Sequence, residues 1–320
     1  MVNNPAPALH LLREMWKIRA FEEKASELFG KAQLHGLLHL SIGQEAVAVG
    51  VCAGLRASDF IVSGHRPHGH AIAKGADPTA LFAELAGRAS GCCRGKGGSM
   101  HIAAPEKGFV TATGVVGGNI PLALGVAFAC REHGKGAIAA VFFGDGAGQS
   151  GAFHESLNIA SLWKLPIVFV CENNGYAEFT PLSAHTLVSR LAQHAQTYAM
   201  PSDGVDGNDV RAVSAAMAQA ADRARGGGGP TFIECATYRL RGHYEGDPAK
   251  YRQLSELSDW KSKDPIRRFS GALLEAGDCT AAQIDAAEAE MRAFIADAAT
   301  KALAGPWPDD SEVRTQVYAD

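Results

Sequence analysis

Two short motifs near the middle of the chain carry side chains that can bind a metal ion. Gly144-Asp145-Gly146 and Asn173-Asn174 each follow a run of apolar residues, with room for one helix between them. A carboxylate, an amide oxygen and a nearby backbone carbonyl are hard ligands that suit Mg²⁺, which completes its coordination with phosphate oxygens and water. The motifs therefore predict a site at which Mg²⁺ bridges the protein and a diphosphate.

The elements around these motifs support the same interpretation. Residues 137–143 and 166–171 have the length and composition of strands buried on both faces of a parallel sheet, and residues 150–163 carry apolar side chains at helical spacing. A right-handed crossover brings the carboxyl ends of both strands to one edge of the sheet, where open α/β folds bind ligands. We therefore expect Asp145 and Asn174 to be neighbours in space.

Two alternatives remain for this region. Gly-Asp-Gly and Asn-Asn are common in turns that bind nothing. Residues 146–151 also match the G-x-G-x-x-G pattern of NAD-dependent dehydrogenases, and Glu172 lies about where such proteins place a ribose-binding acid. However, Asp145 would repel a bound pyrophosphate unless a cation lay between them. The metal interpretation accounts for both motifs, and the NAD interpretation accounts for neither.

The segment from Gly144 to Ala177 resembles the thiamine diphosphate motif. The short sequences FHE, LNIA, WKLP and ENNGY within it are similar to those of the alpha subunit of the first component of 2-oxoacid and acetoin dehydrogenase complexes. The resemblance covers most of the chain in the same order, through IRAFEEK, SIGQEAVAVG, GHRPHGHAIAKG, GKGGSMHI, TGVVGGNIPLALG and YRLRGHYEGD. The GHYEGD segment is more similar to the acetoin branch than to the pyruvate or branched-chain branches.

The resemblance implies the residues of the site. Asp145, Asn174 and the backbone carbonyl of Tyr176 are the implied Mg²⁺ ligands, and His243 and His68 are the implied catalytic residues. His243 is expected to assist acyl transfer to a lipoyl group, and His68 to line the mouth of the active site. The implied thiamine diphosphate-binding residues are His65, Arg66, Gly114, Val116, Gly144, Asp145, Gly146, Ala147, Asn174, Tyr176 and His243.

Three loops also have simpler interpretations. The three histidines of residues 63–70 suggest a metal site or hydrogen-bonded surface groups, and residues 238–247 suggest a solvated charged loop. Residues 91–100 are not a P-loop, because Gly97 stands where that motif requires Ser or Thr. Lys96, Ser99 and His101 are instead expected to order this loop.

The chain departs from the family pattern at several positions. His65 stands where relatives often have Tyr, Pro67 is unusual, and Thr113 replaces a frequent Asn. Pro67 is expected to change the fine geometry of its loop, and Thr113 is expected to alter a loop hydrogen bond without removing the backbone contacts. Tyr244 stands where kinase-regulated pyruvate dehydrogenases have Ser, so phosphorylation control at that position is not expected.

The resemblance also implies a reaction and partners. The expected reaction cleaves acetoin to acetaldehyde and hydroxyethyl-thiamine diphosphate and transfers the acetyl group to lipoamide of an acyltransferase. Pyruvate or a branched-chain 2-oxoacid is the alternative substrate, and a non-catalytic binding subunit is a further alternative. The catalytic glutamate is expected from a separate beta subunit in an α₂β₂ heterotetramer, because the chain has only one recognisable diphosphate-binding unit.

Composition agrees with a soluble enzyme subunit. The chain has 320 residues, of which 47% are hydrophobic, and its net charge of −4 gives no basic surface for nucleic acid. The seven cysteines lack a C-x-x-C pair, so neither a disulfide framework nor a zinc site is indicated. Without a membrane-spanning segment or a signal peptide, we expect a cytoplasmic protein of bacterial origin.

We expect one thiamine diphosphate-binding domain over residues 1–320, with a helical extension at 1–42 and a helical tail at 264–320. The expected fold class is three-layer α/β, with a mostly parallel central sheet and helices on both faces. Residues 59–102 and 238–252 are expected to be loops, and residues 231–237 a strand. Further helices are expected at 9–29, 43–55, 121–133, 210–225 and 280–304, with helical pattern resuming at 265.

Overall fold

A six-stranded parallel sheet forms the centre of the molecule in a computed structural model that describes residues 5–315. The strand order is β2-β1-β3-β4-β8-β7, and every neighbouring pair is parallel. The carboxyl ends of the strands therefore share one edge. The strands are β1 (Phe60–Ser63), β2 (Phe109–Ala112), β3 (Ala139–Gly144), β4 (Ile167–Asn173), β7 (Ser202–Asp206) and β8 (Thr231–Ala236).

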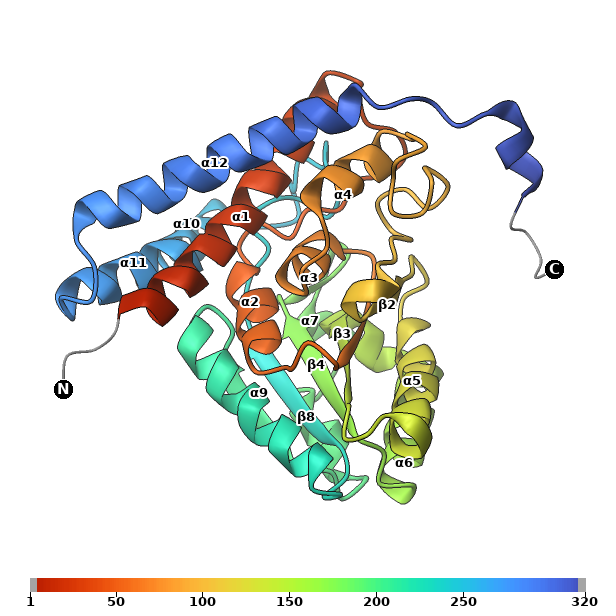
Figure 1. Cartoon of the computed structure of the whole chain (residues 1–320). Helices are drawn as coiled ribbons and strands as arrows, with labels where there is room; N and C mark the ends of the chain where they lie inside the picture. Colours follow the sequence, from red (N-terminus) through yellow and green to blue (C-terminus); the bar gives the residue numbers. More distant parts are fainter. Residues whose placement is uncertain (1–4, 316–320) are drawn as a thin grey trace.

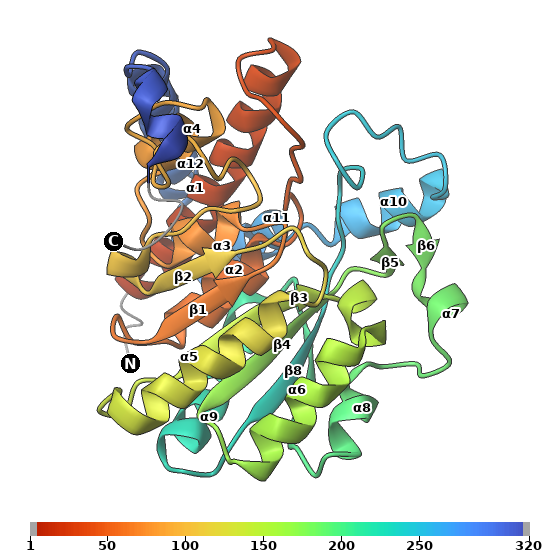
Figure 2. The ribbon, with the colours of Figure 1, turned by 90° about the vertical axis from the view of Figure 1, so that its right-hand side faces the viewer.

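Helices cover both faces of the sheet (Figure 2). Successive residues of the apolar strands point to opposite sides, as the two-residue repeat of a strand requires. Val141 and Phe143 thus pack in one buried core with α5 (Asn119–His133) and α6 (Gly151–Leu162). Ala140 and Phe142 pack in the other, with α2 (Glu45–Ala53), α3 (His68–Ala73) and α9 (Val210–Arg225). The predicted three-layer α/β fold is confirmed.

A further group of helices extends this second core. The long helix α12 (Ala281–Leu303) lies along α1 (Pro5–Gly30) and also contacts α4 (Pro78–Leu85) (Figure 1). The helices α10 (Leu254–Ser262) and α11 (Pro265–Glu275) precede α12. Within residues 5–315, every helix is too short or too polar to span a lipid bilayer.

The proposed division into an extension at 1–42 and a tail at 264–320 stays a prediction. Residues 1–4 and 316–320 of these ranges lie outside the described residues. Side chains of α1, α11 and α12 belong to the same apolar core as α2. The small elements of the molecule are β5 (Tyr176–Ala177), β6 (Thr180–Pro181), α7 (Leu182–His185), α8 (Ala192–Gln196) and the 3₁₀ turns Pro105–Lys107, Asp145–Gln149 and Asp310–Arg314.

The expectation that residues 59–102 form a loop is wrong. This region contains β1, α3 and α4, and α4 begins with a proline after Asp77, whose carboxylate accepts the N–H of Thr79 at 2.9 Å. The helix α3 could not be predicted from an apolar pattern, because its short sequence begins with histidine and glycine and has few apolar residues. The strands β2 and β7 and the helix α10 were also not predicted. The other expected helices and strands are present, and residues 237–253 form the expected loop.

Candidate active site

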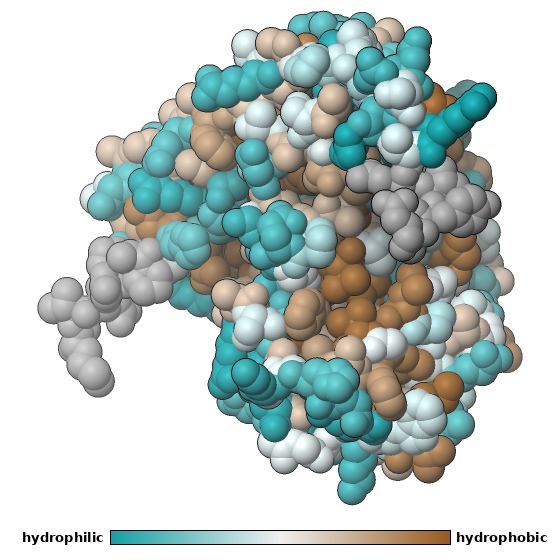
Figure 3. Space-filling view, turned by 45° about the vertical axis from the view of Figure 1, so that its right-hand side comes forward, coloured by the Kyte–Doolittle hydropathy of each residue, from teal (hydrophilic) through white to brown (hydrophobic). Residues whose placement is uncertain are grey.

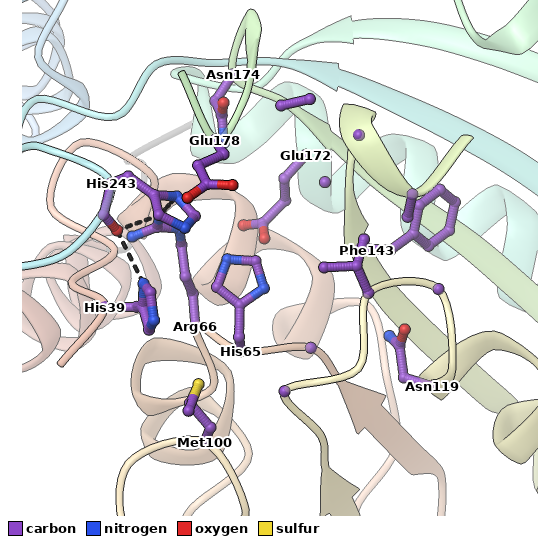
Figure 4. Close-up of a pocket in the computed structure, with 18 of the residues that line it drawn as sticks. His39, His65, Arg66, Met100, Asn119, Phe143, Glu172, Asn174, Glu178 and His243 are labelled. Carbon is purple, nitrogen blue, oxygen red and sulfur yellow. Dashed lines mark hydrogen bonds between the residues drawn. The ribbon is translucent and has the colours of Figure 1, made fainter. Parts of the chain in front are cut away.

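A cavity of about 320 Å³ opens at the carboxyl edge of the sheet (Figure 4). The loops after β1, β2, β3, β4 and β8 surround it, as the parallel topology requires. It therefore brings together side chains from distant parts of the sequence. The predicted residues that line it are His65, Arg66, Gly114, Val116, Gly144, Gly146, Ala147, Asn174, Tyr176 and His243.

Asp145 lies fully buried in the turn that follows β3. Its Oδ2 lies 3.3 Å from Nε2 of His185, whereas its Oδ1 has no hydrogen-bond partner among the described residues. Asn174 is also buried, and its Oδ1 accepts the N–H of Tyr176 at 3.3 Å. A buried carboxylate oxygen without a partner is costly, so this atom suits a cation.

Two buried arginines face the same cavity. Arg66 donates to the carbonyls of Leu40 at 2.6 Å and His243 at 2.7 Å, and Arg239 donates to the carbonyl of Glu178 at 2.9 Å. Within residues 5–315, neither arginine has a carboxylate at ion-pair distance. Burial and the neighbouring Arg239 lower the pKa of Arg66 to about 9, and burial also lowers the pKa of Arg239. Two uncompensated cations in one cavity fit an anionic ligand such as a diphosphate.

The cavity also leaves room for a ligand beside the backbone. A methyl group on Gly64 or Gly144 would meet no protein atom closer than 3.9 Å, so no protein atom requires glycine there. Both residues line the cavity, where a side chain would take up ligand space. Gln44 also lines the cavity and is buried. Neither the nitrogen nor the oxygen of its side-chain amide has a hydrogen-bond partner in the part of the chain that the structure describes. These features fit a bound polar cofactor.

His243 and His39 have complementary hydrogen-bonding roles. Nδ1 of His243 faces Nη2 of Arg66 at 3.2 Å and Nη1 of Arg239 at 3.3 Å, so it accepts, and the proton is assigned to Nε2. His39 donates from Nδ1 to the carbonyl of His243 at 2.9 Å, which leaves its Nε2 as an acceptor. Burial and the nearby arginine charges lower the pKa of His243 to about 3 and that of His39, where burial again dominates, to about 4. Both imidazoles are therefore neutral near pH 7.

The three histidines predicted as a possible metal cluster point to different places. His65 lines the cavity, and burial lowers its pKa. His70 lies between Oγ of Ser63 at 2.8 Å and Oε1 of Glu172 at 3.2 Å. Their separate partners do not support one metal site for the three.

His68 does not lie at the mouth of the cavity. It is fully buried, with Nδ1 at 3.0 Å from Oε2 of Glu22 and Nε2 at 3.0 Å from Oγ of Ser99. Its expected position is thus wrong because α3 turns the side chain toward α1, away from the ligand space. Its catalytic role stays a prediction.

The glycine-rich loop over residues 91–101 is held chiefly by a buried acid. Oε2 of Glu84 accepts the N–H groups of Cys93 at 2.7 Å and Gly95 at 2.8 Å. Oε1 accepts those of Gly97 at 2.7 Å and Gly98 at 3.1 Å. Of the residues expected to order this loop, Ser99 bonds His68, His101 lies 3.2 Å from the carbonyl of Gly97, and Lys96 bonds Thr315.

Sequence reasoning missed several residues of the cavity. His39, Gln44 and Arg239 line it, and so does Glu172, which was considered only as part of the NAD alternative. Gln44 lies in the SIGQEA segment and Arg239 in YRLRGH, both of which carried the family resemblance. The resemblance of those two segments to the family was the signal from which Gln44 and Arg239 could have been predicted as cavity residues.

The fold and the cavity define an α/β protein whose cavity, at the carboxyl edge of a parallel sheet, suits an anionic ligand. Residues 13–310 match the protein family described as dehydrogenase E1 component. The chain belongs to the dehydrogenase E1 component family. Its members are thiamine diphosphate-dependent oxidoreductases, which confirms the predicted enzyme class and organic cofactor.

Individual relatives agree with this assignment. The chain is 46% identical over 312 residues to the alpha subunit of acetoin:2,6-dichlorophenolindophenol oxidoreductase of Bacillus subtilis (strain 168), over 97% of this chain and 93% of the relative. The protein of the same name from Cupriavidus necator is 43% identical over 97% of this chain and 93% of its own. The alpha subunit of the pyruvate dehydrogenase E1 component of Rhizobium meliloti (strain 1021) is 42% identical over 97% of this chain and 89% of the relative. The NAD-dependent alternative is left without support.

Proposed function

We propose that this chain is the alpha subunit of an acetoin dehydrogenase E1 component that binds thiamine diphosphate through Mg²⁺. The observation that carries the proposal is the buried Asp145, whose Oδ1 lacks a partner among the described residues. Its neighbours Gly144 and Gly146 line the cavity, as do Arg66 and Arg239, which have no ion-pair partner among the described residues. Asp145, Asn174 and the carbonyl of Tyr176 would hold the metal ion. The hard oxygen ligands that this set offers suit Mg²⁺.

The remaining cavity residues would hold the organic cofactor. Arg66 would neutralise diphosphate charge, with His65 beside it. The backbone at Gly144, Gly146 and Ala147 would lie along the diphosphate, and the backbone at Gly114 and Val116 would bond the aminopyrimidine ring. When bound, thiamine diphosphate supplies a nucleophilic carbon that adds to a carbonyl group and accepts the electron pair of the bond that breaks.

The chain itself supplies two imidazole groups, those of His39 and His243, in the cavity that would hold the cofactor. His243 offers an N–H donor at Nε2, and His39 offers an acceptor at Nε2, with ring centroids 4.9 Å apart. We assign His243 to hydrogen-bond donation from its Nε2–H during acyl transfer to a lipoyl group, and His39 to accepting a proton from a substrate hydroxyl such as that of acetoin. His39 does not need to lose a proton before it accepts one, since its imidazole is neutral near pH 7.

A beta subunit would complete the site, in an α₂β₂ heterotetramer that passes the acyl group to a lipoyl-bearing acyltransferase. Val115 and Val116 line the cavity and yet are 67% and 58% exposed. Figure 3 shows apolar residues gathered on the face that carries α5 and the loop before it. Exposed apolar surface beside an open cavity is typical of a protein–protein interface.

The test uses this chain purified together with its beta partner. Titration with thiamine diphosphate and Mg²⁺ is expected to show saturable binding, whereas NAD⁺ is not. With dichlorophenolindophenol as electron acceptor, acetoin is expected to be oxidised faster than pyruvate or branched-chain 2-oxoacids. The reason is that the relatives at 46% and 43% identity are named for the oxidation of acetoin with this acceptor. A pyruvate rate well above the acetoin rate would replace the substrate assignment with the pyruvate alternative.

A further inference from the structure

The glycine-rich loop contains two adjacent cysteines that the proposed reaction does not use. Cys92 and Cys93 are both partly exposed, and neither is in a disulfide within residues 5–315. Their sulfur atoms and one carboxylate oxygen of Glu84 all lie within 4.8 Å of one another. Cys52 is the other partly exposed cysteine of the described chain, and the remaining four are buried.

A metal ion is not the best occupant of this cluster. The carboxylate of Glu84 already accepts four backbone N–H groups, at 2.7 to 3.1 Å. A cation bound there would have to displace these donors and leave buried amides without partners, which is costly. The chemistry that remains available is that of the two thiols.

The two thiols are not equivalent. The sulfur atoms of Cys92 and Cys93 lie within 4.8 Å of each other, and the interaction between the two thiols lowers the pKa of Cys93 and raises that of Cys92. Cys93 is therefore the thiol that ionises first, and the thiolate is the form that reacts with oxidants. Cys92 stays protonated beside it, as a resolving thiol does.

The loop connects this pair to the wall of the cavity. It continues from Cys93 to Met100, which lines the cavity. A methyl group on Gly114 would lie 3.3 Å from Sδ of Met100, so Met100 packs against the backbone assigned to the aminopyrimidine ring. A change in the loop at Cys93 would thus reach the ligand space through a short, continuous segment.

We propose that Cys92 and Cys93 form a peroxide-sensitive oxidation site that controls cofactor binding. The Cys93 thiolate attacks one oxygen of hydrogen peroxide, the O–O bond breaks, hydroxide leaves, and Cys93 becomes a sulfenic acid. The Cys92 thiol then attacks the Cys93 sulfur, the S–O bond breaks, water leaves, and a disulfide forms. The two thiols supply the two electrons that reduce the peroxide.

The disulfide would alter the loop and reverse readily. Adjacent Cα atoms are about 3.8 Å apart, closer than the roughly 4.4 to 6.8 Å that disulfides usually span. The backbone at Cys93 must therefore change, and the N–H that anchors this residue to Glu84 would move. Strained disulfides are easily reduced, so the modification suits a reversible switch. The effect on the cofactor rests on the proposed function.

The test compares reduced and peroxide-treated full-length chain in complex with its beta partner, without the acyltransferase and its lipoyl thiols. Peptide mapping by mass spectrometry is expected to find a Cys92–Cys93 disulfide. Calorimetric titration is expected to show thiamine diphosphate binding about tenfold more weakly, the loss expected from one or two backbone hydrogen bonds. Dithiothreitol is expected to restore both measurements.

Two variants sharpen the result. Cys93→Ser is expected to keep its cofactor affinity after peroxide, whereas the matched Cys52→Ser, in α2, is expected to respond as the unmodified chain does. Absence of the disulfide, equal weakening in Cys93→Ser, or a disulfide with unchanged affinity would each overturn the proposal. If the reduced complex binds no thiamine diphosphate, the proposed function is wrong, and peptide mapping still decides whether the thiol pair is oxidised.

Discussion

At the scale of single residues, Asp145 carries the strongest prediction. Asp145→Ala removes the buried carboxylate whose Oδ1 is left for a cation. Even residues that only orient metal ligands cost about 10- to 100-fold in metal affinity when removed, so loss of a ligand is expected to cost about 100-fold or more. Calorimetric titration of the α/β complex with thiamine diphosphate and Mg²⁺ measures the change.

A matched control separates this effect from a general loss of structure. Asp285→Ala removes an exposed carboxylate of α12 and is expected to leave binding unchanged. Assembly with the beta subunit, followed by size-exclusion chromatography, is expected to be the same for both variants. Unchanged Mg²⁺-dependent binding in Asp145→Ala would refute the metal assignment.

The predictable residues of the site are those that directly follow apolar strands. Asp145 and Asn174 could be placed together because one crossover joins their strands. His39 and Gln44 could not, because they enter the cavity from the connection between α1 and α2, whose path depends on tertiary packing. The buried position of His68 was equally unpredictable, since Glu22, its partner, lies on α1.

At the scale of elements, Arg19 joins three helices. Its Nη2 lies 3.0 Å from Oε2 of Glu45 at the start of α2 and 2.9 Å from Oδ2 of Asp264, which caps α11. Arg19→Met leaves two buried carboxylates unpaired, so the free energy of unfolding is expected to fall by about 3 to 5 kcal/mol. Denaturant unfolding followed by circular dichroism measures this change.

The control for Arg19 is Arg13, which lies on the same helix, α1, and forms an ion pair at the surface. Arg13 lies 2.9 Å from Glu290, with 41% and 54% of the two side chains exposed. Arg13→Met is expected to cost less than about 1 kcal/mol, because water screens the pair. Equal effects of the two substitutions would contradict the role given to Arg19.

The elements differ in how well their sequences reveal them. The helix α9 was predicted to the residue, because Asp209 caps its first turn and glycines follow its last residue. The strand β1 has only four residues, and β7 alternates small and acidic residues that give no apolar pattern. Their pairing with β3 and β8 forms them, and such long-range contacts leave no local signal.

At the scale of the whole molecule, the imidazoles of the buried His39 and the partly buried His243 predict how stability depends on pH. The pKa values of His39 and His243 are lowered to about 4 and about 3, from about 6.5 in an unfolded chain. Between these limits the unfolded chain binds more protons than the folded one. The free energy of unfolding is therefore expected to fall as pH decreases from about 6.5 to about 4, and these groups contribute no pH dependence above that range.

Substitution isolates this contribution from that of the carboxylates. A double variant with His39→Asn and His243→Asn is expected to show a shallower decrease over the same pH interval. Carboxylates with a lowered pKa, such as Asp59, contribute equally in both proteins. Parallel pH profiles for the two proteins, measured by urea unfolding, would refute the prediction.

The four N–H groups that converge on Glu84 amount to an anion receptor whose anion is tethered to the protein. Glu84→Ala would remove the anion and leave the receptor, a concave set of amides of the kind that binds small oxyanions. The variant is expected to bind thiamine diphosphate poorly and, if the receptor persists, to recover when free formate fills the vacant position. Chloride at equal ionic strength, which lacks the two oxygens, is expected to rescue less, and calorimetric titration in each salt compares them.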